Sequence, residues 1–144
     1  VRAIPLPPIS LKEGPVPICP PNKKIKVFFD QLGSTIEIKN EKLSINFWST
    51  SGMMASYYQI LETMSIWLTK KGVKKLDAQK YITSLFLALS KDAVVNSKKD
   101  LKILVKESQT PKGLNEQGLK ELSKKGVYKS VTNTLNNIHK RLNK

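Results

Sequence analysis

The stretch "SQTPKGLNEQGLKEL", residues 108–122, contains side chains suited to holding a small polar ligand. Thr110 precedes a proline and is expected to be extended, and Gly113 allows a backbone turn that a Cβ atom would hinder. The helix that begins next exposes free backbone N–H groups, which attract anions such as a carboxylate. Asn115 adds a hydrogen-bond donor and an acceptor. This pattern indicates a site for a small carboxylic acid.

The same stretch also has a purely structural interpretation. Glu116 and Gln117 lie in the first turn of the expected helix. Acidic and amide side chains are favoured there because the amino end of a helix carries a partial positive charge. The residues alone therefore leave both interpretations open.

Other catalytic chemistry finds little support in the residue types. The single cysteine, Cys19 in "PICPP", can form neither a disulfide within the chain nor a thiolate metal cluster. The single histidine, His139, stands beside Lys140 and Arg141 without a general base next to it. These observations argue against Ser-His and Cys-His catalysis and against a metal site.

The net charge of +14 comes almost entirely from lysine. Arg2 and Arg141 are the only arginines among the 25 basic residues, and base readout in nucleic acids depends on the bidentate arginine fork. Most of the lysines are interpreted as solvated helix faces. Their field favours a small anionic substrate, and we expect no nucleic-acid partner.

Residues 1–39 are expected to form two short extended pieces, a helix and a strand. Seven of the eight prolines lie in residues 1–22, where they favour extended backbone. Apolar residues recur at helical spacing in residues 25–33, with Gly33 as the expected C-cap, and residues 34–39 alternate as in a strand. These strands are too few and too short to form a stable buried sheet by themselves. We therefore expect them to pair with strands that this chain does not supply.

The run from Leu43 to Thr69 carries one formal charge, Glu62, and predicts a helix that is apolar around most of its girth. Its many serines and threonines make a membrane span a poor alternative. Too few other helices remain in 144 residues to surround it. We therefore expect a homodimer through the long apolar helix 51–70, and no membrane partner.

The rest of the chain is expected to be helical. Asp77 is the expected N-cap of a helix over residues 77–96. The inward face of that helix is expected to hold Ala78, Ile82, Leu85, Leu89 and Ala93. A short basic helix, a helix closed by Gly126 and a final helix follow. The expected inward stripe of the final helix comprises Val127, Val131, Leu135, Ile138 and Leu142.

This order of parts resembles the C-terminal half of the pyrroline-5-carboxylate reductase family. The first segment, "VRAIPLPPISLKEGP", is similar to the family's V-R-x-M-P-N-T-P segment. "STSGMM", residues 49–54, is similar to S-G-S-G-P-A at the start of the family's dimer helix, and "TPKGLNEQGLKEL" is similar to S-P-G-G-T-T-I-x-x-L. The last segment also resembles the T-P-G-G-L-N-E-Q signature of a reductase-like subgroup, from which it differs only by Lys112.

Several substrate-facing positions depart from the family's pattern. Leu6 stands in place of an asparagine. Thr50 and Met53 replace a glycine and a proline of the serine-rich segment. Leu114 and Asn115 replace the two threonines of the turn. The resemblance therefore implies a retained scaffold with an altered substrate.

The resemblance implies a substrate site and a smaller cofactor contact. The implied substrate-binding residues are Thr50, Ser51, Thr110, Lys112, Gly113 and Asn115. Pro5 and Leu6 are implied to contact NADP or NAD, and no residue is implied to be catalytic because a nicotinamide carries the hydride chemistry. Lys112 adds a positive charge that the family's glycine lacks.

The implied fold is mainly α. A helical dimerisation bundle over residues 40–144 would follow an α+β remnant of a Rossmann-type NAD(P)-binding domain over residues 1–39. No G-x-G-x-x-G segment follows a strand in this sequence, so the rest of that domain is expected to lie outside the chain, and the fragment alone is expected to be inactive. The implied activity is NAD(P)-dependent reduction of a C=N bond, or its reverse, in a small carboxylate-bearing imine or amine. Proline biosynthesis in the cytoplasm is the implied setting.

Two other functions stay open. One is a non-catalytic dimeric scaffold derived from the same helical domain, and a Gly-rich βαβ unit encoded upstream would favour the enzyme over it. The other is a nucleic-acid-binding helical domain, which a steep salt dependence of oligonucleotide binding would support.

Overall fold

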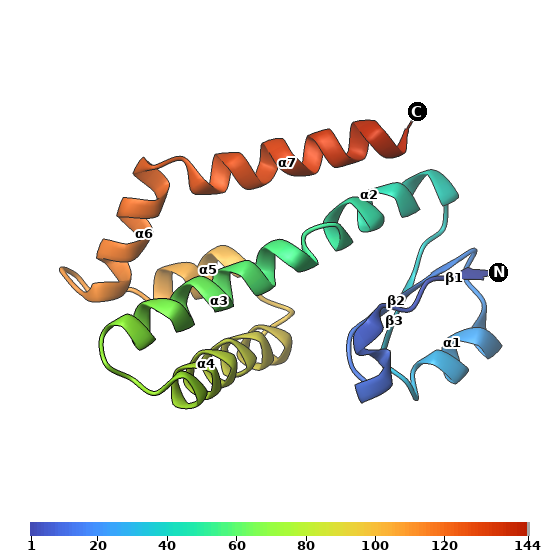
Figure 1. Cartoon of the computed structure of the whole chain (residues 1–144). Helices are drawn as coiled ribbons and strands as arrows, with labels where there is room; N and C mark the ends of the chain where they lie inside the picture. Colours follow the sequence, from blue (N-terminus) through green and yellow to red (C-terminus); the bar gives the residue numbers. More distant parts are fainter. Residues whose placement is uncertain (144) are drawn as a thin grey trace. The chain divides into compact units, whose positions relative to one another are not determined.

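The structure of the chain is a computed structural model, and it describes residues 1–143. It is mostly helical, with one small sheet near the amino end (Figure 1). The chain divides into two compact units. The first unit, residues 1–53 and 133–144, contains the sheet, and the second, residues 54–132, is helical. The expected boundary between residues 39 and 40 stays a prediction.

The sheet of the first unit has three strands in the order β1-β2-β3. β1, Arg2–Ala3, runs antiparallel to β2, Pro15–Cys19, and β2 runs parallel to β3, Ser34–Glu37. The helix α1, Lys23–Phe29, connects the parallel pair, as a crossover between parallel strands requires. Val16, Ile18 and Ile38 are buried and form the core of this unit. The three strands thus pair with one another.

Two expectations for this segment are wrong. Residues Pro7–Leu11 form a 3₁₀ helix instead of extended chain, because prolines are tolerated in the first turn of a helix. Gly33 is not the C-cap of α1, which ends at Asp30. A Cβ atom at Gly33 would lie 2.5 Å from the backbone oxygen of Gly14, the same oxygen that accepts the N–H of Ser34 at 2.8 Å. Gly33 therefore permits a close backbone approach where β3 begins.

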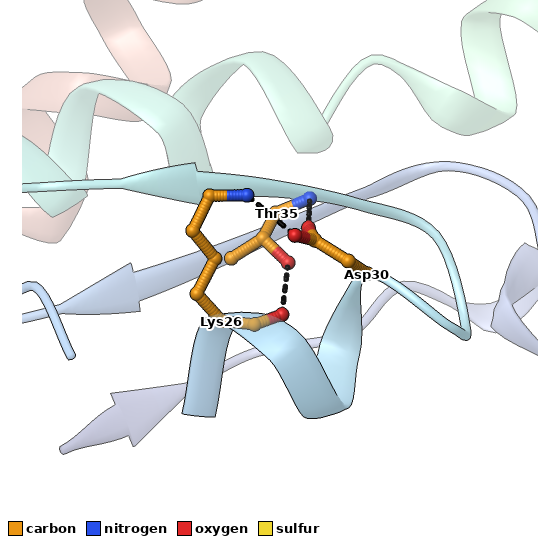
Figure 2. Close-up of polar contacts among 3 residues, drawn as sticks. All are labelled: Lys26, Asp30 and Thr35. Atoms are coloured by element: carbon orange, nitrogen blue, oxygen red, sulfur yellow. Dashed lines mark hydrogen bonds and ion pairs between the residues drawn. The ribbon is translucent and has the colours of Figure 1, made fainter. Parts of the chain in front are cut away.

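A polar contact joins α1 to β3 (Figure 2). The Lys26 ammonium donates to the carboxylate of Asp30, and the backbone N–H of Thr35 donates to the other carboxylate oxygen at 3.3 Å. The Thr35 hydroxyl donates to the Lys26 carbonyl at 3.4 Å. Hydrogen bonding from the Lys26 side chain, and then from Thr35, lowers the pKa of Asp30 below its ordinary value of 3.8. The ionised carboxylate thus ties the end of α1 to the first residues of β3.

The apolar run from Leu43 to Thr69, expected to be one helix, is two helices, and the expected helix 51–70 corresponds to the second of them. α2 spans Glu41–Ser51, and α3 spans Met54–Lys70. The hydroxyls of Thr50 and Ser51 both donate to the Phe47 carbonyl, at 2.7 and 3.1 Å, and Gly52 follows. Back-bonding of this kind bends helices, and glycine is a poor helix former, so the break falls there.

Four further helices complete the chain. They are α4, Lys75–Val95; α5, Leu101–Glu107; α6, Leu114–Lys124; and α7, Val127–Leu142. Gly126 follows the C-cap of α6 with a φ of 74°, as expected. Asp77 is not the N-cap of α4, because the helix begins earlier, after Lys74, and the carboxylate lies in the first turn.

Within the second unit, α3 packs against α4. Ala78 and Ile82 are buried, and the rings of Tyr57 and Phe86 lie 6.1 Å apart between centroids. The expected inward face of α4 is only half covered, since Leu89 is 54% exposed. The inward stripe expected for α7 is also partly open, with Val127 and Leu142 both exposed.

No helix among residues 1–143 is both long and apolar enough to span a membrane.

The polar contact of α1 predicts a pH-dependent stability of the first unit. Because the pKa of Asp30 is lowered in the folded chain, its contribution is complete above the ordinary value of 3.8 and is lost as the pH falls through the lower, folded pKa. Asp30→Asn should lower the melting temperature by a few degrees at most at neutral pH, because exposed pairs contribute little. Wild type and variant should converge once the pH falls below the folded pKa of Asp30.

Lysine variants give the control for this experiment. Lys26→Met should shrink the pH-dependent loss, because the Lys26 side chain has the largest effect on the pKa of Asp30. Lys24→Met removes a neighbouring charge of α1 outside the contact and should leave the pH dependence unchanged. Thermal melting monitored by circular dichroism measures both variants across the pH range. Equal effects of the two substitutions would show that Lys26 does not lower the pKa of Asp30.

Candidate functional site

The turn between α5 and α6 is closed by its own backbone. The N–H of Gly113 donates to the carbonyl of Thr110 at 2.8 Å, which defines a β-turn over Thr110–Pro111–Lys112–Gly113. Proline is favoured at the second position of such turns, and the third residue takes a positive φ in one common type. Lys112 has a φ of 61°, in the left-handed region that usually selects glycine.

Gly113 is required because a Cβ atom would hinder the turn, as expected, and not because of its backbone conformation. Its φ of −80° and ψ of 166° are ordinary extended values that any residue adopts. A Cβ atom there would instead lie 2.1 Å from the Thr110 hydroxyl oxygen and 2.9 Å from the Thr110 carbonyl oxygen. The residue that takes the left-handed conformation is Lys112. The sequence therefore predicted the role of Gly113 but gave no expectation for the left-handed Lys112.

Glu116 fastens the turn to the first turn of α6. Its carboxylate accepts the backbone N–H of Lys112 at 2.6 Å and the ammonium of Lys120 at 2.6 Å. Hydrogen bonding from Lys120, and then from the Lys112 N–H, lowers the pKa of Glu116, so the carboxylate is ionised at neutral pH. This is close to a capping box, in which an acid in the first helical turn bonds a backbone N–H just before the helix.

Asn115 ties α6 back to the end of α5. Its side-chain N–H donates to the carbonyl of Ser108 at 2.9 Å, and Ser108 is the C-cap of α5. The amide oxygen has no protein donor among the hydrogen bonds of the described residues, so Asn115 keeps an acceptor for a ligand. One of the two N–H groups of the amide is used by Ser108, which leaves the other for a substrate carboxylate.

The α5–α6 turn therefore brings together four of the six expected substrate-binding residues: Thr110, Lys112, Gly113 and Asn115. All of them except the half-buried Gly113 are exposed. Glu116 was not among the expected site residues, because the sequence indicated only an acidic residue in the first turn of a helix. Its signal was the spacing of three residues from the N-cap to an acid, which is the capping-box signature.

The other two expected substrate-binding residues, Thr50 and Ser51, lie in the last turn of α2 in the first unit. Their hydroxyls donate within the helix to Phe47, which leaves only their acceptor lone pairs for a ligand. The following Gly52 is close to α7, since a Cβ atom there would lie 3.1 Å from the Ile138 side chain. That Thr50 and Ser51 bind a substrate stays a prediction.

The residues expected to touch a cofactor lie before the 3₁₀ helix. Pro5 is exposed, and the half-buried Leu6 is the extended N-cap whose carbonyl accepts the N–H of Ile9 at 3.0 Å. Neither side chain offers a polar group to a nucleotide. Whether they contact a nicotinamide stays a prediction.

The βαβ unit of this chain does not fit a dinucleotide. A pyrophosphate needs a glycine-rich turn between the strand and the helix, so that the backbone can approach it closely. Here the turn from β2 to α1 is Pro20–Pro21–Asn22, and the Asn22 side chain already accepts the N–H of Ile25 at 3.0 Å. Proline supplies no N–H and glycine is absent from this turn, so the residues present form no pyrophosphate cradle.

Comparison with solved structures shows the fold. A pyrroline-5-carboxylate reductase from Coxiella burnetii superposes with a TM-score of 0.80 at 20% identity, over 97% of this chain and 54% of its own. Plasmodium falciparum pyrroline carboxylate reductase with NADP bound gives 0.76 at 21% identity, over 96% and 58%. The reductase from Streptococcus pyogenes gives 0.75 at 19% identity, over 92% and 54%.

This chain thus spans between half and three-fifths of the length of those reductases. The chain matches none of the curated protein sequences with which it was compared. Residues 42–144 match the family described as pyrroline-5-carboxylate reductase dimerisation, which covers all of the helices from α2 to α7 apart from the first residue of α2. The chain therefore belongs to the pyrroline-5-carboxylate reductase dimerisation family.

Proposed function

We propose that this chain is the dimer-forming and substrate-contacting part of an NAD(P)-dependent oxidoreductase. The reaction would reduce a C=N bond, or run in reverse, on a small carboxylate-bearing imine or amine. The family match over residues 42–144 carries the proposal. The subgroup with the T-P-G-G-L-N-E-Q signature is the proposed branch of the family, and cytoplasmic proline metabolism is the proposed setting.

The chemistry of hydride transfer would come from a nicotinamide and not from a side chain of this chain. The misfit of the β2–α1 turn supports a dinucleotide site formed mainly by polypeptide outside this sequence. The part of this chain would be to bind and orient the substrate. The amide oxygen of Asn115, the ammonium of Lys112 and the hydroxyl of Thr110 are the groups proposed for this role.

A homodimer is the proposed assembly, because this chain cannot cover its own apolar surface. Among the described residues only five apolar side chains are fully buried, while Tyr58, Ile60 and Trp67 of α3 are each more than half exposed. Exposed apolar surface on this scale marks an interaction site. A groove of about 960 Å³ runs between α3 and α4 and is lined by Leu61, Ile66 and Ile82 among others. A second copy of the chain is the proposed cover.

A non-catalytic scaffold is the second candidate function. It is favoured by one observation: the Glu116 carboxylate already accepts the Lys112 N–H that a substrate carboxylate could use. The two candidates differ in what the turn between α5 and α6 does. As a substrate turn it should affect kinetics, and as a helix cap it should affect only stability.

The proposed dimer predicts the effect of charges on α3. Leu61→Asp or Met64→Asp should give aggregated or unfolded protein, because the interface on the order of 2,000 Å² that an obligate dimer needs would be lost. Leu114→Asp is the matched control, since Leu114 is 86% exposed and an acid is favoured in the first turn of α6. Sedimentation equilibrium measures the assembly. A soluble, folded monomer of the unmutated chain would rule the dimer out.

The two glycines of α6 and its turn predict opposite changes in stability. Gly113→Ala should lower the free energy of unfolding by about 1–3 kcal/mol, because the new Cβ atom collides with the Thr110 carbonyl. Gly118→Ala should raise it by about 0.5–1 kcal/mol, because alanine is the better helix former and the site is open. Lys112→Gly should cause no loss, because it relieves a left-handed lysine. Urea unfolding checks all three, and equal effects of the two alanines would show the turn geometry to be wrong.

Asn115 separates the two candidate functions. In the complete oxidoreductase, Asn115→Ala should lower kcat/KM about ten- to a hundredfold, the cost of one hydrogen bond to a charged group. It should also lower the free energy of unfolding by about 0.5–1.5 kcal/mol, because the bond to Ser108 is lost. Asn136→Ala makes the same chemical change at an exposed position of α7 and should leave kinetics unchanged. A stability loss without any kinetic change would favour the scaffold.

A further inference from the structure

The turn between α3 and α4 concentrates positive charge. Lys70, Lys71, Lys74 and Lys75 occupy four of six consecutive positions, and all four are exposed. None of the ion pairs among residues 1–143 involves them. Asp77 is the nearest acid in sequence, in the first turn of α4.

This turn is rigid. The N–H of Gly72 donates to the Thr69 carbonyl at 3.0 Å, and the N–H of Val73 donates to the Leu68 carbonyl at 3.1 Å. Gly72 has a φ of 95°. Together these features form a Schellman motif, which ends a helix in one defined conformation. The lysines are therefore held at fixed backbone positions around a sharp turn.

The placement of two of these lysines opposes local stability. Lys74 is the N-cap of α4 and makes no capping hydrogen bond, although serine, threonine, aspartate and asparagine are strongly preferred there. Lys75 is the first residue of the helix, where the partial positive charge of the helix end repels a cation. Departures of this kind from local sequence rules are expected chiefly at functional or strained sites.

Apolar side chains accompany the lysines. Leu76 is 75% exposed in the first turn of α4, and Trp67 is 59% exposed one turn before Lys71. The Lys71 ammonium lies 5.8 Å from the centroid of the Trp67 ring. Lys70 and Lys75 line the groove between α3 and α4, whereas Lys71, Leu76 and Trp67 do not, so a second copy seated in that groove does not need these three.

We propose that the α3–α4 turn docks on an anionic phospholipid surface, with the lysines against the headgroups and Leu76 in the interface. Clustered lysines beside exposed leucine and tryptophan match such a surface, which is negatively charged outside and apolar beneath. A nucleic acid would use the charges but not Leu76, and the turn contains no arginine for base readout. The expectation of no membrane partner was argued against a span over residues 43–69, and a surface contact is a different association.

The test is co-sedimentation of the full chain with vesicles. Binding should be strong to phosphatidylcholine vesicles containing about 30% phosphatidylserine, weak to phosphatidylcholine alone, and weaker with added salt. The double variant Lys74→Ser, Lys75→Ser should bind about 30-fold more weakly, from the usual contribution of each lysine near such a surface. Lys124→Ser with Lys125→Ser changes the net charge equally at the end of α6 and should lower binding less than about threefold.

Stability and insertion provide independent readouts. Lys74→Ser installs a preferred N-cap, so its melting temperature should rise by a few degrees while lipid binding falls, which excludes unfolding as the cause. In a Trp48→Phe background Trp67 is the sole tryptophan, and its emission should shift to the blue on anionic vesicles. Leu76→Ser should weaken binding in high salt. Equal losses from the two lysine pairs would overturn the proposal. Tight oligonucleotide binding that depends on Lys74 and Lys75, without vesicle binding, would also overturn it.

Discussion

The shortage of apolar burial is the constraint on which the rest of this structure depends. Ordering a chain costs conformational entropy that only buried apolar surface repays on the required scale. In the first unit Val16, Ile18 and Ile38 supply that burial, and in the second Ala78 and Ile82 do so. The helices carry far more apolar side chains than these. The proposed dimer would cover part of them.

Close backbone approaches shape the positions that matter most for the candidate site. Gly33 lets β3 begin against the Gly14 carbonyl, Gly52 lets α2 end against Ile138, and Gly113 lets the α5–α6 turn close on Thr110. In each case a methyl group would meet an atom of a neighbouring segment or of the turn itself. The conformational freedom of glycine decides none of the three, because none has a positive φ. These three positions require glycine because it has no Cβ atom.

Charge pairs contribute little to the stability of this protein. The ion pairs of the described residues are all on the surface, such as Lys120 with Glu116, and pairs of this kind contribute little. Glu116 matters for the proposed ligand binding instead. Its carboxylate accepts the backbone N–H of Lys112, which lies in the turn that resembles the family's substrate turn. A ligand carboxylate would have to compete with it or bind beside it. Lys74 and Lys75 also stand at the start of α4, where the partial positive charge of the helix end disfavours a cation.

The sequence by itself determined the helical elements, the turn before α6 and the family. Each depends on residues within a few positions of one another: apolar spacing for α3 and α4, Gly126 for the end of α6, and quoted motifs for the family. The tertiary structure alone decided that Gly33 meets Gly14 and that Asn115 bonds Ser108. It also decided that the run near Gly52 breaks into two helices and that Lys112, not Gly113, takes the left-handed conformation. The physical reason is that these features depend on which backbone atoms approach one another in space, and local periodicity contains no information on such distances.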